Sequence, residues 1–192
     1  QFPTLDLRGL MAIPPPVDEP NAARPYFIRL RGLAEAFRLT ELSMGMTHDF
    51  EVAIEEGATI IDVGGESTKP GVERVSMDEE LTRIIPVIHE LAKKGALVSV
   101  DTMRAEVAAL AVSAGAKIIN DVSGGLADPQ MYSLIAKNHD VQYIIMHWRT
   151  HSKTMQELAV YKDVVKEVKE ELEERINSAI EAGVNPEQVI ID

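Results

Sequence analysis

Polar side chains stand at the ends of several short, apolar runs of this sequence. They are Asp62, Asp101, Asn120 with Asp121, and Asp192. Carboxylate and amide oxygens accept hydrogen bonds, and one carboxylate can accept two, from a ring N–H and from a neighbouring exocyclic amine. If the runs are adjacent parallel strands, these side chains share one edge and predict a site for a flat nitrogen heterocycle. The alternative that each residue only caps a following helix stays open.

Two other kinds of chemistry fit the sequence less well. His147 and His151 could hold a metal ion with Asp192, but their spacing brings two ligands together only on a helix, and the residues between them read as a loop. Ser43 or Ser67 as a nucleophile would need a G-x-S-x-G turn, which the sequence lacks. We therefore favour neither a metal-dependent hydrolase nor a serine nucleophile.

The elements that must position these residues show a repeated pattern. A helix-like stretch ends, usually at a glycine, and a β-branched run follows. A glycine beyond a helix supplies a left-handed cap, and a continuous apolar run is typical of a strand inside a parallel sheet. The pattern predicts strands at residues 7–13, 41–44, 59–63, 97–100, 117–119, 141–146 and 188–191.

Helix signals lie between these runs. Ser76 and Glu79 have the spacing of a capping box, and Asp128 precedes a proline that is expected at the first helical position. Apolar residues recur at every fourth position from Val160 to Ile180, which predicts a helix with one face packed on the sheet.

Alternating strands and helices form either an open doubly wound sheet or a barrel. The sequence has no glycine-rich phosphate turn after a strand, whereas polar residues at the ends of several strands are typical of barrel active sites. We therefore predict an α/β fold, a single (β/α)8 TIM-barrel domain over residues 1–192. A whole barrel needs about 250 residues, so we expect an incomplete one of about seven β/α units. Its open edges predict a homodimer or marginal solubility.

The amino-acid composition narrows the classes of partner that we expect for this chain. The chain has 31 acidic and 19 basic residues and a net charge of −12, so we expect no nucleic acid and no membrane partner. It has no cysteine, which excludes thiolate catalysis and cysteine metal sites. No apolar run approaches the roughly 20 residues of a membrane helix, and no signal peptide opens the chain. We expect a cytoplasmic protein that binds small molecules.

Residues 59–192 resemble the dihydropteroate synthase family. The match rests on the stretch IIDVGGESTKPG at 60–71 and on shorter stretches at 98–102, 118–124, 146–149 and 189–192. The resemblance implies a transferase of folate biosynthesis, which joins p-aminobenzoate to a dihydropterin pyrophosphate with Mg²⁺. It implies that the pterin lies against Asp101, Asn120, Met146 and Asp192, with Asp62 as a further substrate-binding residue. It also implies that p-aminobenzoate is enclosed by a loop containing Ser67, Thr68, Lys69 and Pro70.

Residues 1–58 do not match that family. Residues 7–14 and 42–54 resemble the pyridoxal-phosphate homeostasis protein family, another barrel, in which a Ser-x-Gly-x-Ser/Thr turn binds the phosphate through backbone N–H groups. The resemblance implies phosphate binding by Ser43, Gly45, Met46 and Thr47.

The resemblance of the two segments to two different families predicts a chimera, with its junction near residues 54–59. Neither parent's full catalytic set is present, since the synthase family's metal-binding Asn and later Lys, Arg and His, and the other family's Schiff-base Lys, have no counterpart. Two alternatives therefore stand beside the synthase-like function. One is an engineered barrel scaffold without activity, and the other is a barrel that binds phosphate or pyridoxal phosphate non-covalently.

Overall fold

A computed structural model of the chain describes residues 7–46 and 49–192. Within these residues, seven parallel strands form one sheet in the order of the chain. The strands are β1 (Gly9–Ala12), β2 (Glu41–Met44), β3 (Ile60–Gly64), β4 (Leu97–Asp101), β5 (Ile118–Asp121), β6 (Gln142–Ile145) and β7 (Val189–Ile191). The α-helices are α1 (Arg24–Phe37), α2 (Phe50–Glu55), α3 (Met77–Lys93), α4 (Ala105–Ala114), α5 (Met131–Lys137) and α6 (Val164–Glu181), with 3₁₀ turns at Pro20–Ala23 (η1) and Pro186–Gln188 (η2).

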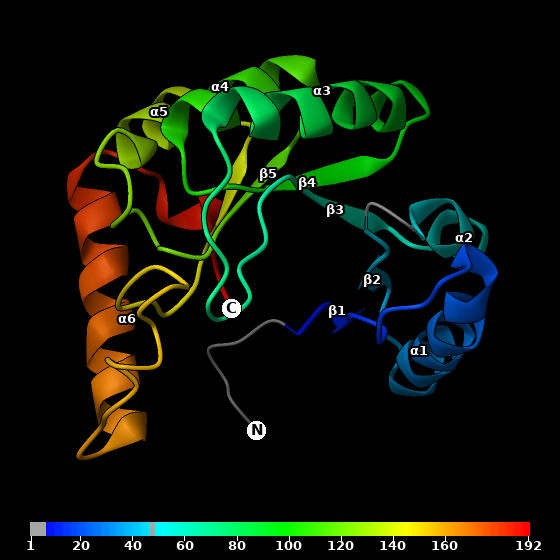
Figure 1. Ribbon diagram of the computed structural model, residues 1–192, viewed down its shortest axis with the longest axis horizontal. Helices are drawn as coiled ribbons and strands as arrows, with labels where there is room; N and C mark the ends of the chain where they lie inside the picture. The colour runs from blue at the N-terminus through cyan, green and yellow to red at the C-terminus, as the bar shows by residue number, and fades with distance from the viewer. Residues whose placement is uncertain (1–6, 47–48) are drawn as a thin grey trace.

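The sheet curls, with its helices on the outside (Figure 1). A helix follows each strand from β1 to β6, and the described strands do not pair β7 back to β1. The prediction of a (β/α)8-type fold with about seven units is therefore confirmed. No helix in the described part of the chain has both the length and the hydropathy needed to span a bilayer.

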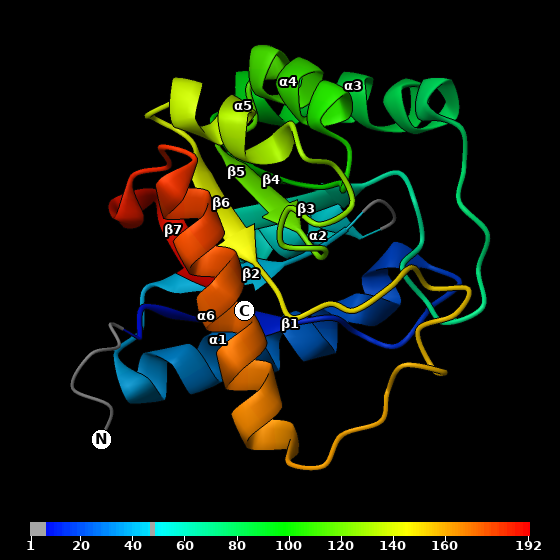
Figure 2. The same cartoon turned by 90° about the vertical axis from the view of Figure 1, so that its left-hand side faces the viewer.

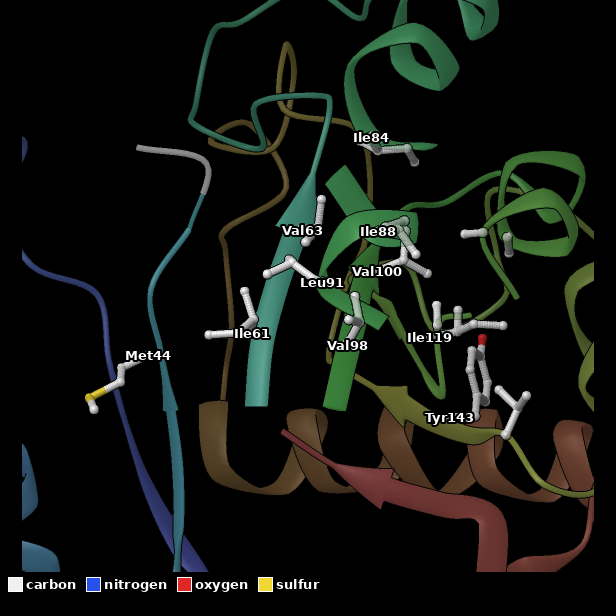
Figure 3. Packing of buried hydrophobic residues seen from close by; sticks show 14 of the residues in the cluster. Met44, Ile61, Val63, Ile84, Ile88, Leu91, Val98, Val100, Ile119 and Tyr143 are labelled. Atoms are coloured by element: carbon white, nitrogen blue, oxygen red, sulfur yellow. The ribbon is translucent and has the colours of Figure 1, made fainter. Parts of the chain in front are cut away.

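The core lies between the sheet and the outer helices. Neighbouring residues of a strand point to opposite faces, and alternate residues such as Ile61 and Val63 of β3 are buried in the core. Ile84, Ile88 and Leu91 of α3, spaced along one helix face, pack in the same cluster (Figure 3). The residues between them on the strands consequently point to the inner, concave face of the sheet.

The capping box at the start of α3 is confirmed in part. Ser76 Oγ accepts a hydrogen bond from the Glu79 backbone N–H at 3.2 Å. The Glu79 carboxylate does not return the bond but pairs with Arg83, one helical turn later. The Ser76 side chain therefore fixes the point at which the loop ends and α3 begins.

Replacing Ser76 with alanine should lower the free energy of unfolding by about 1 kcal/mol, because the Glu79 N–H loses its partner at the helix end. Ser113→Ala is the matched control, since Ser113 lies inside α4 and bonds only the Ala109 carbonyl four residues earlier. Urea denaturation of both variants checks this. Equal stability losses in the two variants would contradict the cap.

Two helix predictions need correction. Asp128 is not the N-cap of α5, because this helix begins at Met131 with Gln130 at the cap position, and Pro129 lies in the preceding turn and not at the first helical position. The Asp128 carboxylate accepts from the N–H groups of Gln130 and of Ala105, which begins α4.

The long amphipathic helix α6 packs on the protein only in part. Ala179 near its C-terminal end is buried, whereas Val164 and Val165 at its start are 53% and 76% exposed. Figure 2 shows the first turns of α6 extending below the sheet. The expected contact of its whole apolar face with the sheet is therefore wrong, because the helix runs past the end of the short strands it covers.

Candidate functional site

Asp62, Asp101 and Asn120 meet on the concave face near the carboxyl ends of β3, β4 and β5. In the sheet register Asp62 lies beside Ser99, and Asp101 lies beside both Gly64 and Asn120. Asn120 Nδ2 donates a hydrogen bond to Asp62 Oδ2 at 3.2 Å. The convergence that the sequence predicted for these three residues is present. We call Asp62, Asp101 and Asn120 the polar rim.

The polar rim contains a buried acceptor that lacks a donor within the described chain. Asp62 Oδ1 and Asn120 Oδ1 are buried, and so is Ser99 Oγ beside them. Buried polar groups in folded proteins are nearly always paired, because an unpaired one retains its full desolvation cost. The Ser99 hydroxyl acts as a hydrogen-bond donor that lowers the pKa of Asp62, so the acceptor left without a donor among the described residues is Asn120 Oδ1. This amide oxygen points to a donor supplied from outside the chain, such as an N–H group of a ligand.

The carboxyl groups of the rim have shifted pKa values. Burial raises the pKa of Asp101 to about 8, and the carboxylates of Asp62, Glu80, Asp121 and Glu66 add to this. Burial also raises the pKa of Asp62, as does the Asp192 carboxylate, against the hydrogen bonds from Ser99 and Asn120. Such shifts concentrate where carboxyl groups serve binding or catalysis.

A glycine leaves room beside Asp101. A Cβ at residue 64 would lie 3.3 Å from Asp101 Cβ and 3.4 Å from one of its carboxyl oxygens. Glycine at this position therefore keeps the space next to the carboxyl group open on the rim.

Asp192 and Met146 approach the rim from the next two strands. Asp192 follows β7, where its backbone N–H donates to the Ile145 carbonyl at 3.2 Å, and its charge acts on Asp62. Met146 follows β6 and is half-buried. Both residues stand at the same carboxyl edge of the sheet, as expected, although Asp192 is exposed.

Asp121 does not belong to the rim, contrary to the sequence prediction. It is fully buried, and its carboxylate accepts bonds from the Ser123 N–H and hydroxyl, the Gly125 N–H and the Tyr143 hydroxyl. It points to the opposite face from Asn120, since neighbours on a strand alternate. Asp121 therefore shapes the turn after β5 and does not face a ligand.

Tyr143→Phe should lower the free energy of unfolding by about 1–2 kcal/mol, because the buried Asp121 carboxylate loses its 2.8 Å bond from the tyrosine hydroxyl. Tyr26→Phe, on the exposed side of α1, is the matched control and should change little. Thermal unfolding of both variants at neutral pH measures the difference. A neutral effect of Tyr143→Phe would show that this hydroxyl does not support Asp121.

The loop after β3 (residues 65–76, the β3 loop) contains Ser67, Thr68, Lys69 and Pro70. Ser67, Lys69 and Pro70 are exposed and Thr68 is half-buried. Of this loop's side chains, Glu66 is the most firmly held, by Arg74 at 2.7 Å and Arg104 at 2.9 Å. The β3 loop is therefore anchored at Glu66, and the polar groups that follow lie beside the rim.

An ion-pair network, which was not predicted from the sequence, supports the start of the β3 loop at Glu66. Arg104 pairs with Glu66 and with Glu80, which is 1% exposed and accepts from the Thr102 hydroxyl at 2.6 Å. One signal was available, because Glu80 occupies the same helix face as Ile84 and Ile88. A carboxylate at an apolar position of an amphipathic helix indicates a buried cationic partner.

The predicted phosphate-binding turn has no support in the geometry. Ser43 lies on β2 beside Ile60, Gly45 adopts a φ of 90°, and the Met46 N–H already donates to the Asp49 carboxylate at 2.8 Å. Thr47 lies outside the described residues. The Asp49 carboxylate therefore occupies the position at the Met46 N–H where a phosphate oxygen would have to bind.

The histidines are not brought together for metal binding. His147 Nε2 lies 2.8 Å from Glu171 of α6, while His151 packs edge-on against Trp148 with its Nδ1 buried and unpartnered. In the part of the chain described by the structure, no group of three or more His, Asp or Glu side chains could hold a metal ion.

The fold and the rim define a class: barrel-type α/β proteins with a polar ligand site at the carboxyl ends of parallel strands. The chain belongs to the pterin-binding enzyme family, whose model matches residues 42–192. The dihydropteroate synthase resemblance is thereby confirmed.

Among curated relatives, the chain is 49% identical over 140 residues to dihydropteroate synthase of Mycobacterium leprae, covering 72% of this chain and 49% of that protein. It is 44% identical over 152 residues to that of Bacillus subtilis, covering 79% and 50%. The chain thus spans about half the length of the curated relatives it matches.

Solved structures agree. Dihydropteroate synthase of Thermus thermophilus, in complex with 4-aminobenzoate, superposes with a TM-score of 0.69 at 38% identity, covering 78% of this chain and 59% of that one. The Burkholderia cenocepacia enzyme complexed with 7,8-dihydropteroate gives 0.68 at 33% identity, covering 79% and 57%.

The family match begins at Leu42, well before residue 59. The predicted chimeric junction near residues 54–59 therefore lies inside the matched region. The match gives no support to a change of family at that point.

Proposed function

We propose that this chain forms the pterin-binding part of a dihydropteroate synthase. The observation that carries the proposal is the polar rim, where the buried acceptor Asn120 Oδ1, beside the high-pKa carboxyl of Asp101, lacks a donor within the described chain. A pterin edge presents a ring N–H and an exocyclic amine side by side, which matches carboxylate and amide acceptors. The structures of relatives with dihydropteroate and 4-aminobenzoate support the same substrate classes.

Each rim residue has a defined part in this proposal. Asp101, Asn120 and Asp192 bind the polar edge of the pterin, with Asp62 holding the Asn120 amide through its 3.2 Å bond. Met146 lies against the ring. When the bond from the pterin methylene carbon to pyrophosphate breaks, positive charge develops on the pterin, and nearby carboxylates stabilise it. The amine of p-aminobenzoate then forms the new C–N bond and loses a proton.

The β3 loop supplies the second substrate's surroundings. We propose that Ser67, Thr68, Lys69 and Pro70 enclose p-aminobenzoate, since they follow directly after β3 beside the rim. The ammonium group of Lys69 would face an aromatic carboxylate of opposite charge.

In the described ranges, no cluster of three or more acidic or histidine side chains could hold a metal ion by itself. Mg²⁺ commonly keeps several waters and binds through one or two carboxylates together with substrate phosphates, so it would be held mainly by the pyrophosphate of the substrate. The proposal accordingly assigns no step to the metal and expects the pterin ring to bind without it.

Calorimetric titration with a dihydropterin pyrophosphate analogue tests the proposal. Binding should be present with or without Mg²⁺, and Asp101→Ala should weaken it about tenfold to a hundredfold, because a buried acceptor of N–H groups is lost. Asp140→Ala is the matched control, since Asp140 is an exposed carboxylate that pairs with Lys117. No binding by the folded wild-type protein would refute the proposal.

We also propose a domain organisation, a location and an oligomeric state for the protein. Residues 1–192 would act as one domain in the cytoplasm, and the open sheet edges would associate in a homodimer. An origin of residues 1–58 in a pyridoxal-phosphate barrel has no support in the comparisons, and residues 42–54, one of the two stretches on which it rested, lie inside the family match that begins at Leu42. Pyridoxal phosphate added to the protein should, if it binds, keep a free-aldehyde spectrum; an internal aldimine would contradict this.

A further inference from the structure

The two ends of the β3 loop are held by two arginines, Arg83 within α3 and Arg104 at the N-terminal end of α4. Arg83 of α3 donates to the Gly65 carbonyl at 2.7 Å, and Arg104 donates to the Val75 carbonyl at 2.7 Å. Neither bond reaches the middle of the loop, residues 67–73, which we call the tip. The position of the tip must therefore come from other contacts.

Those contacts come from a second loop, residues 146–163, which follows β6 and is called here the β6 loop. Ser152 Oγ donates to the Thr68 carbonyl at 3.1 Å, and the Ser152 carbonyl accepts from the Gly71 N–H at 2.9 Å. Lys153 Nζ lies 2.9 Å from Glu73. The remaining hydrogen bonds of the tip within the described chain are internal to it. Figures 1 and 2 both show the two loops side by side.

The β6 loop is itself a firm support. Arg149 pairs with Glu167 and Glu171 of α6, donates to the carbonyls of Leu158 and Val160, and lies 4.0 Å from the Tyr161 ring centre. Arg149 thus ties both ends of the β6 loop to α6. The tip of the β3 loop therefore rests on a loop that Arg149 fixes to α6.

We propose that Ser152 and Lys153 are positioning residues, which hold the tip of the β3 loop where Thr68 and Lys69 meet an aromatic amine carrying a carboxylate. This inference rests on the proposed function and extends it to residues outside the rim. Neither residue touches the substrate. They act through the backbone of Thr68 and Gly71 and through the Glu73 ion pair.

The test compares Ser152→Ala/Lys153→Met with wild type by amide hydrogen exchange and by ligand binding. The Gly71 N–H keeps its bond to the Ser152 carbonyl in this variant, but that bond should open more often once the bond from Ser152 Oγ to the Thr68 carbonyl is lost. Exchange of the Gly71 N–H should therefore rise about threefold to tenfold, since loss of one hydrogen bond changes an equilibrium by that factor. Affinity for p-aminobenzoate, measured with a saturating pterin analogue, should fall by a similar factor while pterin affinity stays unchanged. Lys166→Met, which breaks the exposed Lys166–Glu170 pair on α6, is the control.

A charge exchange separates positioning from damage to the fold. Lys153→Glu alone should weaken p-aminobenzoate binding, and Lys153→Glu with Glu73→Lys should restore it, because the ion pair is rebuilt in reverse. Unchanged Gly71 exchange, or unchanged p-aminobenzoate affinity despite faster exchange, would overturn the inference. A wild-type protein that binds no pterin would instead defeat the proposed function, and the exchange comparison would still decide whether the β6 loop holds the tip.

Discussion

Replacing Arg104 with methionine should lower the free energy of unfolding by about 3–5 kcal/mol. Arg104 is the cationic partner of Glu80, a carboxylate that is 1% exposed, and it also pairs with Glu66. Methionine keeps most of the aliphatic packing but leaves the Glu80 charge buried with only the Thr102 hydroxyl as a donor. An uncompensated buried charge is among the most costly single changes in a folded protein.

Two companion variants make this prediction specific. Arg104→Met combined with Glu80→Met should recover most of the loss, because both buried charges are then removed. Lys117→Met breaks the exposed Lys117–Asp140 pair and should cost less than about 1 kcal/mol. Urea midpoints with unchanged slopes would measure all three. A single variant Arg104→Met as stable as Lys117→Met would show that Glu80 does not depend on this arginine.

The second large effect concerns pH and pterin affinity. Burial and the carboxylates of Asp62, Glu80, Asp121 and Glu66 raise the pKa of Asp101 to about 8, so its carboxyl group is protonated in the free protein at pH 6. A pterin edge that donates N–H groups requires the ionised form. Affinity should therefore rise up to tenfold per pH unit below the pKa and level off above about pH 8.

Asp101→Asn should remove most of this pH dependence, leaving the smaller contribution of Asp62. Calorimetry between pH 6 and 9 in buffers of different ionisation enthalpy would show proton release on binding to wild type and little release with the variant. Affinity that falls as pH rises would mean that Asp101 binds the ligand as a neutral acid and donates the hydrogen bond.

The same pKa also predicts a change in stability that needs no ligand. The pKa of Asp101 is higher in the folded protein than in the unfolded chain, so between about pH 4 and 8 the folded state binds more protons. Stability contributed by this group is then present at low pH and is lost as pH rises to about 8. Asp101→Asn should unfold with a flatter pH profile, and an identical profile would argue against the buried acid.

Local signals in the sequence predicted most of the fold. The glycines at residues 57, 95, 115 and 183 all adopt positive φ after a helix, as expected for left-handed caps. β2 matches its expected range of 41–44, whereas β1 covers only residues 9–12 of an expected 7–13. These features depend on backbone conformation and local hydropathy, which short stretches determine.

The site was harder to predict because it depends on which face of a strand is inside. Asn120 and Asp121 are neighbours with similar chemistry, yet Asn120 faces the rim and Asp121 is buried beneath the helices. Likewise, Glu80 is paired with an arginine 24 residues later, a contact that only the packed structure brings about. Sequence alone located the rim to the correct strand ends but could not separate ligand-facing groups from structural ones.

The most direct measurement is a crystal structure of the chain with a pterin analogue bound. The account predicts the ring on the concave face, with its N–H groups within hydrogen-bond distance of Asp62, Asp101 or Asn120. The cavity of about 380 Å³ beside Trp148 and Arg149, between the β6 loop and α6, is the competing location. A pterin bound there, with the polar rim holding only water, would contradict the account.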